Sequence, residues 1–461
     1  MNQFAKPQFD PDRSSDQQLD EAINTLAAQF TNSFPERVPQ LRTIGREAEF
    51  PVVTATGEAA DVRRLWEPLL AADERRGYAP MRPHYDTTTP NMIVGLDGAD
   101  YNYELEVGLG TVEVVVRPCT DLLTIQTIMQ QAISRLVHAA ACYNWQILAY
   151  GIQPISPPSL ALMAPKQRYQ SLYRAMGDEW LWYTVTASDQ CHVAIQRDEA
   201  VLMLNFGNLM APVMIAFCGH SPVHSGVLSP FCSAREGQHQ LIDMHKFRDG
   251  GARHGMPVRP FTSIADYVRT MAQSTYLIVR ADNEIIPSSR PFTSYLREHG
   301  PDFEAFLFHE HYIWNSARLR THYGTLEIRP ACQQPWSEHM AAMALSVGLI
   351  EAAQPIMDYV QTALGEAYWS IMRTFHQQAI AKGLAAPQPA RNFLRTIILL
   401  AEAGLQRRGQ GEERWLRPIF DRLELGLNPA QRIRKIFQTH GNTGLLSHTA
   451  IRPNTVLFTP T

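Results

Sequence analysis

The fold of this chain is decided by the stretch Thr43-Ile44-Gly45-Arg46-Glu47-Ala48-Glu49-Phe50-Pro51-Val52-Val53. It predicts a β-strand, in which Glu47 and Glu49 point to the same face because they are two residues apart. A solvated strand face holds two neighbouring carboxylates at little cost, whereas a concave face needs a cation to offset their repulsion. This stretch alone leaves both interpretations open.

A second acidic region, residues 101–116, predicts a β-hairpin with carboxylates on both strands. Glu104 and Glu106 alternate with apolar residues before a glycine-containing turn, and Glu113 follows inside a Val-rich strand. A carboxylate in such an apolar strand is costly unless something binds it. The alternative is a hairpin with one face exposed to water.

Two later strands bring further polar groups to one face. Gln190 and His192 alternate with apolar residues, so both can line a cavity; for His192 a hydrogen-bonded structural role is the alternative. Glu327 and Arg329 share one face of another strand, where a plain ion pair is the alternative to a ligand site. The long, polar loop at 221–259 is typical of lids and binding loops.

The composition is that of a soluble globular protein with a large core. The chain has 461 residues, of which 45% are hydrophobic and 19% are charged. Its net charge of -4 gives no reason to expect a nucleic acid or an anionic membrane as partner. The apolar stretch 200–218 is interrupted by Asn205, Gly207 and Asn208 and predicts a buried helix rather than a membrane span.

The amino-terminal residues and the cysteines predict a cytoplasmic location. Residues 1–20 are polar and lack the apolar core of a signal peptide. The six cysteines are scattered singly, without the close pairs of a zinc site. We therefore expect reduced thiols in a cytoplasmic protein.

The order of the predicted elements favours an α+β fold with an antiparallel sheet over a doubly wound parallel sheet. Strands are joined by hairpins or long excursions, and no glycine-rich phosphate loop follows any strand. We predict a single domain over residues 1–461, with a loose tail at 1–14 and a mainly helical part at about 338–461. Further expectations are helices at 60–74, 121–142 (capped by Thr120), 198–218 and 264–271, strands at 146–150, 184–196 and 275–279, and a Pro-rich loop at 78–90.

Several segments, in order, resemble the plant and bacterial type of glutamate–cysteine ligase, in the glutamine synthetase-like superfamily. Together they span roughly residues 17–425, and their shared order and spacing make the resemblance specific. The matching segments are the Gly-x-Glu-x-Glu strand at 45–49, the carboxylate hairpin at 103–114, Gly151-Ile152-Gln153-Pro154, residues 163–169 and 186–193, Ser221-Pro222 with Gly226, Ser233 and Arg235, the Arg-rich strands at 318–329, and residues 403–409.

The chain departs from the family pattern at three places. Glu106-Val107-Gly108-Leu109-Gly110 stands where the family has Glu-Pro-Gly-Gly-Gln, and the count to Glu113 differs by one residue. Pro330-Ala331-Cys332-Gln333-Gln334 replaces small residues and an Asp, and residues 78–99 match poorly. The metal and ATP residues are retained, whereas the identity of the accepting amine is put in doubt.

The resemblance implies a curved, mainly antiparallel β-sheet that forms an open half-barrel active site, flanked by helices. It also implies an ATP-dependent ligase that joins the γ-carboxylate of glutamate to an amine, usually that of cysteine, through a γ-glutamyl phosphate. Phosphoryl transfer depends on charge neutralisation and alignment, and Mg²⁺ takes carboxylate oxygens. Two or more Mg²⁺ ions are assigned to Glu47, Glu49, Glu106, Glu113 and Glu327, with Glu104 set aside as an extra candidate.

The same resemblance implies roles for the other polar candidates. Guanidinium groups suit carboxylate and phosphate because their paired donors match both anions. The assignments are Arg168, Arg235, Gln190 and Ser221 to substrate binding, Arg46, Arg318 and Arg329 to ATP phosphate, and Glu49 and Arg329 to catalysis. Lys166 is expected in solvent unless it reaches nucleotide, and Arg407 and Arg408 on a solvated helix face.

Three functions remain open at this point. The first is a glutamate–cysteine ligase for glutathione-type thiol biosynthesis, the second a related ligase for another amine, and the third a non-catalytic binding relative. Retention of all five glutamates argues against the third, since without metal their repulsion is hard to offset. The expected partners are small molecules only, and the chain is expected to be a monomer or a homodimer.

Overall fold

The computed structural model describes residues 15–72, 78–89, 91–241, 253–281 and 284–453, so the predicted tail at 1–14 lies outside the described residues. Within them, a nine-stranded sheet has the order β14-β15-β7-β1-β5-β4-β3-β2, with β6 paired to β1. All of its pairings are antiparallel. Its strands are β1 (Ile44–Val53), β2 (Arg82–Tyr85), β3 (Ile93–Asp97), β4 (Tyr101–Leu105), β5 (Thr111–Cys119), β6 (Gln146–Ile147), β7 (Asp189–Ala194), β14 (Ala317–Arg320) and β15 (Thr325–Ile328).

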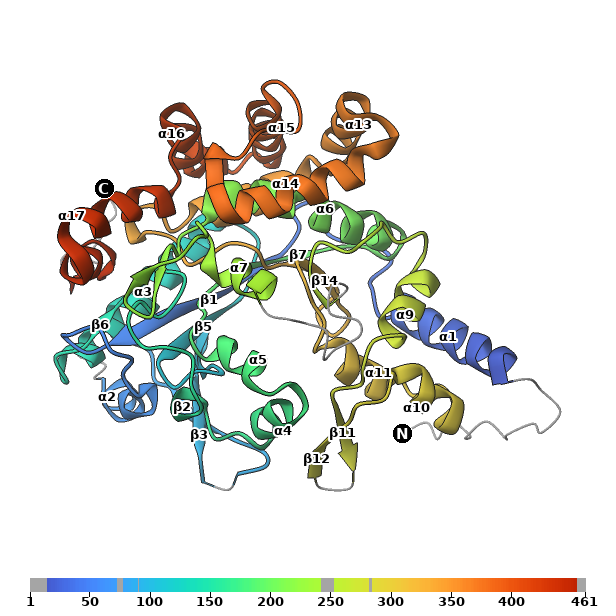
Figure 1. Ribbon diagram of the computed structural model, residues 1–461, viewed down its shortest axis with the longest axis horizontal. Helices are drawn as coiled ribbons and strands as arrows, with labels where there is room; N and C mark the ends of the chain where they lie inside the picture. Colours follow the sequence, from blue (N-terminus) through green and yellow to red (C-terminus); the bar gives the residue numbers. More distant parts are fainter. Residues whose placement is uncertain (1–14, 73–77, 90, 242–252, 282–283, 454–461) are drawn as a thin grey trace.

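Helices surround this sheet, and among the described residues three short strand pairs lie outside it (Figure 1). The short strands are β8 (Val223–His224), β9 (Val227–Leu228), β10 (His254–Gly255), β11 (Ile278–Ala281), β12 (Glu284–Pro287) and β13 (Trp314–Asn315). The helices are α1 (Ser15–Asn32), α2 (Trp66–Leu70), α3 (Leu122–Ala141), α4 (Gln167–Met176), α5 (Asp178–Leu181), α6 (Ala200–Cys218), α7 (Ala234–Leu241), α9 (Ile264–Ala272), α10 (Phe292–His299), α11 (Phe303–Glu310), α12 (Ala341–Glu351), α13 (Ala353–Leu364), α14 (Tyr368–Lys382), α15 (Phe393–Arg408), α16 (Arg417–Leu425) and α17 (Pro429–Thr449).

The side chains of strand β1 point to two different faces of the sheet, one apolar and one polar. Ala48 and Phe50 are fully buried on one face, against which α3, α6 and α12 pack. Burying a side chain such as Phe50 stabilises the fold by about 1.5–3 kcal/mol, so this face fixes the register of the strand. Because side chains alternate along a strand, Glu47 and Glu49 are presented on the opposite face.

The polar face is concave. Arg318 on β14 and Glu113 on β5 line one cavity, although three strands lie between theirs in the sheet order. In a flat sheet these strands would be about 19 Å apart, given a spacing of about 4.8 Å. The sheet is therefore curved, and it stays open because its terminal strands β14 and β2 do not pair. The expected α+β class, with an open and mainly antiparallel sheet, is confirmed.

Several predicted element boundaries were wrong. The helix expected at 60–74 is reduced to a 3-10 turn at Val62–Leu65 followed by α2. The Pro-rich stretch expected as a loop contains β2, an edge strand whose backbone pairs with β3 without any apolar pattern. The strand expected at 184–196 starts only at Asp189, because Trp182–Thr184 forms a 3-10 turn.

The boundary of α3 also needs a correction. Asp121, not Thr120, caps this helix, because the Asp121 carboxylate accepts a hydrogen bond of 2.8 Å from the Thr124 backbone N–H. The strand expected at 146–150 is limited to the two residues of β6. The helices expected at 198–218 and 264–271 are confirmed as α6 and α9.

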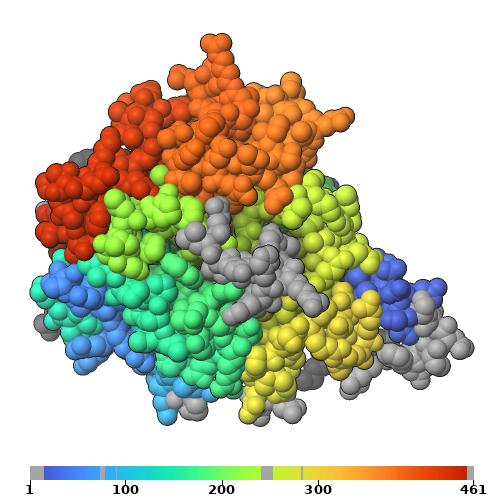
Figure 2. All heavy atoms as spheres, viewed as in Figure 1, coloured from blue at the N-terminus to red at the C-terminus, as the bar shows by residue number. Residues whose placement is uncertain are grey.

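The carboxyl-terminal part, from α12 to α17, is helical as expected, and in Figure 2 it forms the orange and red end of the molecule. Arg407 is exposed, but the prediction that Arg408 lies on a solvated face was wrong. Arg408 donates to Glu412 and Glu351 over 2.6 and 2.9 Å, and to the Thr120 carbonyl over 2.8 Å. These contacts of Arg408 connect the helical part to the residue before α3 and its cap.

Among the described residues, one continuous helical segment, Arg197–Cys218, has the length and apolar composition of a membrane span. Most of it is buried inside the protein, where α6 packs against α14 and the sheet. Two further segments, Trp336–Glu351 and Ala353–Ala385, pass the same test only when taken together across a sharp bend. The burial of α6 matches the core helix that the sequence predicted.

Candidate active site

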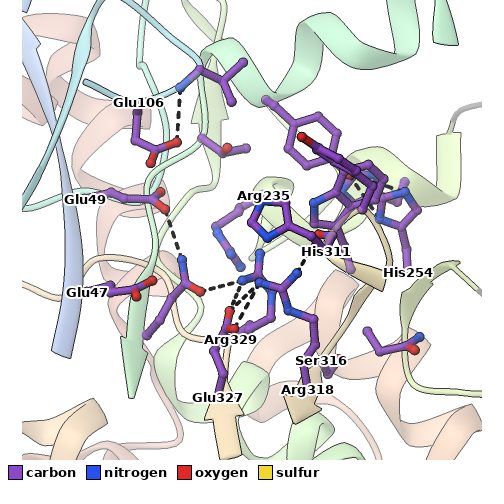
Figure 3. Close-up of a pocket in the computed structure, with 18 of the residues that line it drawn as sticks. Glu47, Glu49, Glu106, Arg235, His254, His311, Ser316, Arg318, Glu327 and Arg329 are labelled. Carbon is purple, nitrogen blue, oxygen red and sulfur yellow. Dashed lines mark hydrogen bonds and ion pairs between the residues drawn. The ribbon is translucent and has the colours of Figure 1, made fainter. Parts of the chain in front are cut away.

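The concave face of the sheet holds a cavity rich in opposite charges (Figure 3). Among the described residues, its lining includes six glutamates and five arginines. The glutamates are Glu47, Glu49, Glu106, Glu113, Glu236 and Glu327. The arginines are Arg168, Arg235, Arg318, Arg320 and Arg329. So many charges at the wall of one cavity indicate a site for charged ligands.

A first carboxylate cluster consists of Glu49, Glu106 and Glu113. Glu49 and Glu113 are direct cross-strand partners, and one oxygen of each of the three residues lies within 4.8 Å of the others. Burial and the charge of Glu106 raise the pKa of Glu49 to about 7, with Arg235 opposing. Burial and the same neighbouring charge raise the pKa of Glu113 well above its ordinary value. The cluster therefore carries a repulsion that a bound cation would relieve.

A second cluster consists of Glu47, His192 and Glu327. One ligand atom of each lies within 4.8 Å of the others, and His192 Nε2 is 3.1 Å from Glu47 Oε1. Burial alone would raise the pKa of Glu47, but the attraction of His192 leaves it below its ordinary value. An imidazole between two carboxylates is a donor set that suits a divalent cation.

Three arginines surround Glu327. Arg318 Nη2 donates to Glu327 over 2.8 Å, Arg320 Nε lies 3.3 Å from it, and Arg329 Nη1 forms a third, shorter contact. Burial opposes ionisation, but these charges hold the pKa of Glu327 well below its ordinary value. Three guanidinium groups on one carboxylate leave net positive charge, which is suited to phosphate oxygens.

Gln190 connects the first cluster to the arginines. Its Nε2 donates to Glu49 Oε1 over 3.1 Å, and its Oε1 accepts from Arg329 Nη1 over 2.6 Å. The Gln190 amide is thus oriented by both neighbours and holds Arg329 beside the carboxylates. This observation agrees with the expectation that Gln190 lines the cavity.

Arg235 projects from the first turn of α7. Its backbone N–H donates to Ser221 Oγ over 3.1 Å, and its guanidinium forms an ion pair with Glu236. Ser221 is fully buried and also contacts Cys332 Sγ at 3.4 Å, so it does not line the cavity. The predicted substrate contact of Ser221 is therefore not supported; its hydroxyl positions Arg235 instead.

Arg46 is not brought to the cavity. It lies on the opposite face of β1, fully buried, in a two-bond pair with Asp189 at 2.8 and 2.9 Å. The same guanidinium donates to the His339 carbonyl over 2.9 Å. The prediction of a phosphate contact for Arg46 was wrong, because Arg46 and Glu47 are adjacent on a strand and point to opposite faces.

Two other candidates lie beside the cavity rather than in it. Glu104 is the cross-strand partner of Glu113, but it forms a separate cluster with His84 and Asp97. Lys166 is buried, and its Nζ donates to the Leu105 carbonyl over 2.6 Å, so the prediction of a solvated lysine was wrong. Burial and the charge of Arg168 lower the pKa of Lys166 to about 8.

The wall that faces the glutamates is aromatic and was missed in the sequence. It contains Tyr183, His239, His254 and Trp314, which come from four separate segments. Arg320 and Glu236 were also missed. Arg320 could have been found from its alternation with Arg318, whereas the four rings share no local pattern and meet only in three dimensions.

These features define a class of protein. A concave antiparallel sheet that carries two carboxylate clusters beside a group of arginines is suited to an ATP-dependent ligase that activates a carboxylate. The chain belongs to the glutamate–cysteine ligase family 2 (GCS2), whose sequence model matches residues 43–449. The predicted family resemblance and the assignment as an enzyme of the ligase class are confirmed.

Curated relatives share this family name at low identity. Glutamate–cysteine ligase A of the chloroplast of Oryza sativa subsp. indica is 24% identical over 372 residues, which cover 76% of this chain and 72% of that protein. The chloroplast glutamate–cysteine ligase of Medicago truncatula is 23% identical over 376 residues, 76% of this chain and 70% of its own.

Solved structures support the fold. A glutamate–cysteine ligase of Francisella tularensis in complex with AMP superimposes with a TM-score of 0.53 at 10% identity, over 92% of this chain and 89% of that one. A bifunctional glutathione synthetase of Pasteurella multocida gives a TM-score of 0.52 at 14% identity, over 92% of this chain. This chain spans about half of the Pasteurella protein, 52%.

Proposed function

We propose that this protein uses ATP to join the γ-carboxylate of L-glutamate to an amine, through a γ-glutamyl phosphate. The proposal rests on one observation: two carboxylate clusters and the arginines that contact Glu327 lie around one cavity. This arrangement supports phosphoryl transfer between a nucleotide and a carboxylate, which requires aligned substrates and neutralised charge more than a covalent catalyst.

The donor set of the two clusters fits Mg²⁺. Carboxylate oxygens are its preferred protein ligands. Burial and the charge of Glu106 raise the pKa values of Glu49 and Glu113, and a bound cation would offset both effects. Glu49, Glu106 and Glu113 would hold one ion, and Glu47, His192 and Glu327 a second. Bound Mg²⁺ would neutralise phosphate oxygens and align the reacting groups.

The arginines divide between two tasks. Arg318, Arg320 and Arg329 sit together on Glu327 and would hold the transferring phosphoryl group. Arg235 and Arg168 lie elsewhere on the cavity wall and would bind the carboxylates of the donor glutamate. Loss of the guanidinium partner of a buried carboxylate ligand typically costs a few kcal/mol of binding free energy.

Cysteine is the first candidate for the accepting amine, because the family and the relatives are named for it. A second candidate is a different amine, which the aromatic wall and the changed segment 330–334 favour. A non-catalytic role is the third candidate, and it leaves the repulsion of Glu106 with Glu49 and Glu113 without a bound cation to offset it. A cytoplasmic location and a monomeric or homodimeric state stay predictions.

The proposal is tested by ADP release from the full chain with Mg²⁺, ATP and glutamate across a panel of amines. We expect release that depends on glutamate and on Mg²⁺, and γ-glutamyl hydroxamate when hydroxylamine is the trapping amine. No glutamate-dependent ADP release with any amine would overturn both enzyme readings. Turnover without preference for cysteine would overturn only the first candidate.

A further inference from the structure

The aromatic wall of the cavity is a stack of half-buried rings. His239 and His254 stack with ring centres 3.9 Å apart at 16°, and His254 and Trp314 stack at 5.1 Å and 9°. The pairing of β10 with β13 sets His254 opposite Trp314, and Tyr183 packs against Trp314 at 4.9 Å. These four rings line the cavity and keep part of their surface accessible to a ligand.

The wall carries no charge of its own near neutral pH. Burial and the nearby charge of Arg235 lower the pKa of His239 to about 3. Burial, together with His239, lowers the pKa of His254 well below its ordinary value. Neutral stacked rings are poor partners for phosphate but good partners for another flat ring. This half of the cavity is therefore chemically distinct from the arginine cluster.

Polar groups without partners lie among these rings. Within the described residues, Trp180 Nε1, Gln238 Oε1 and Ser316 Oγ are buried and make no hydrogen bond. All three residues line the cavity and are at most 3% exposed. Buried polar atoms are nearly always paired, so these three point to a ligand with polar atoms at the edge of its ring.

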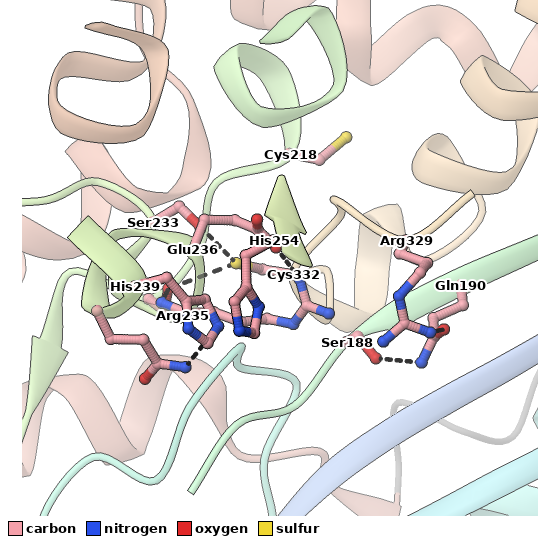
Figure 4. Close-up of polar contacts among 12 residues, drawn as sticks. Ser188, Gln190, Cys218, Ser233, Arg235, Glu236, His239, His254, Arg329 and Cys332 are labelled. Carbon is pink, nitrogen blue, oxygen red and sulfur yellow. Dashed lines mark hydrogen bonds and ion pairs between the residues drawn. The ribbon is translucent and has the colours of Figure 1, made fainter. Parts of the chain in front are cut away.

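Among the described residues, Glu236 is the lining carboxylate that shares helix α7 with His239. It lies beside Arg235 at the start of α7, and its hydrogen bonding among the described residues is to Arg235 alone. Burial raises the pKa of Glu236, with Arg235 opposing. Figure 4 shows Arg235, Glu236, His239 and His254 gathered together, with Arg329 next to Gln190. A carboxylate here can accept a hydrogen bond from an ammonium group that enters the cavity beside the rings.

The occupant of this wall is not the base of the nucleotide. Arg329 belongs to the proposed phosphoryl site and lines the same cavity as His254. When the γ-phosphate of ATP lies at these arginines, the ribose and the other two phosphates separate the base from them. The donor glutamate has no ring to stack. The accepting amine is the remaining substrate, and it must come close to the activated carboxylate.

We propose that this wall is the acceptor site, built for a primary amine that bears an aromatic or heteroaromatic ring, with Glu236 holding the ammonium group. The ammonium gives one proton to the Glu236 carboxylate, and its nitrogen then attacks the γ-carbonyl carbon of the γ-glutamyl phosphate. The new C–N bond forms, the C–O bond to phosphate breaks, and the second proton leaves with inorganic phosphate. The inference rests on the proposed function and names its substrate class.

The acceptor class is tested with histidine, phenylalanine, tyramine and histamine against cysteine and alanine. We expect kcat/KM for at least one ring-bearing amine to exceed that for cysteine by tenfold or more. Trp314→Leu should raise KM for that amine at least tenfold, whereas the matched control Trp415→Leu, on a 3-10 helix and outside the cavity lining, should not. If Trp314→Leu fails to fold, Tyr183→Leu replaces it. Cysteine surpassing all ring-bearing amines, or no product from any of them, overturns the proposal.

The role of Glu236 is tested by comparing two acceptors in Glu236→Gln. Hydroxylamine is uncharged near neutral pH and needs no ammonium site, so amine transfer should fall at least 30-fold more than hydroxamate formation. The deficit should shrink as pH rises and more free amine is present. Parallel loss of both reactions would place Glu236 at the donor glutamate and overturn its assigned role. If the unaltered protein forms no hydroxamate, the proposed function itself fails, and the two failures are thereby distinguished.

Discussion

Glu49 on β1 and Glu113 on β5 lie directly opposite each other, with carboxylate oxygens within 4.8 Å in a buried site. Both pKa values are raised, by burial and by the charge of Glu106. A carboxyl whose pKa is higher in the folded state than in the unfolded chain destabilises the fold at pH values above its unfolded pKa.

Removal of one of these charges should stabilise the metal-free protein. In EDTA at pH 8, we expect Glu113→Gln to raise the free energy of unfolding by on the order of 1 kcal/mol. The exposed Glu366→Gln is the matched control and should change little. Denaturant unfolding measures both variants, and a Glu113→Gln protein less stable than the original would contradict the repulsion.

Loss of Glu49 should abolish turnover without unfolding the protein. Glu49→Gln removes a proposed metal ligand and the partner of Gln190 Nε2, so we expect ADP release below detection with an unchanged circular dichroism spectrum. Near-normal turnover would refute the assignment of Glu49 to metal.

The two clusters should bind divalent cations separately. Titration with Mn²⁺ should detect two sites, of which Glu113→Gln removes one and His192→Gln the other. The expected loss in affinity at an altered site is at least tenfold, because each site offers three protein ligands. Loss of both sites in His192→Gln, or of neither, would contradict the division into two clusters.

Arg46 should contribute to stability and not to nucleotide binding. Breaking its buried pair leaves the Asp189 carboxylate without a compensating charge. Arg46→Met should therefore lower the free energy of unfolding by about 3–5 kcal/mol. A double variant, Arg46→Met with Asp189→Leu, should lose less than the sum of the two single variants. Additive losses in denaturant unfolding would argue against direct coupling.

His220 should make stability depend on pH. Its Nδ1 lies 2.9 Å from the Gln333 carbonyl oxygen, and burial lowers its pKa to about 3 from about 6.5. Between these values the unfolded chain takes up a proton that the folded protein does not, so stability falls as pH drops from about 6.5 toward 3 and is unaffected above.

His220→Gln should remove this dependence. Relative to the variant, the free energy of unfolding of the original protein should fall by about 2–3 kcal/mol between pH 7.5 and pH 4.5. The exposed His440→Gln serves as control and should show no such change. An equal pH dependence in the His220 variant and the original would assign the effect to other groups.

The amino-acid sequence alone determined the class of fold and most of the acidic site. Alternation along 43–53 puts Glu47 and Glu49 on one face whatever packs around them, because side chains of a strand alternate by geometry. The same rule brought Gln190, Glu327, Arg329 and Arg318 to the cavity. The same alternation argued against a phosphate contact for Arg46, because a residue next to Glu47 points to the opposite, apolar face.

Only the tertiary structure decided which of these groups meet and what faces them. The curvature of the sheet brings β5 toward β14, and the alternation of side chains along a strand does not encode this curvature. His192 joins Glu47 and Glu327 because three neighbouring strands share a register. The aromatic wall is assembled from residues far apart in the chain, so its rings, and with them the proposed choice of accepting amine, follow from long-range packing that periodicity does not encode.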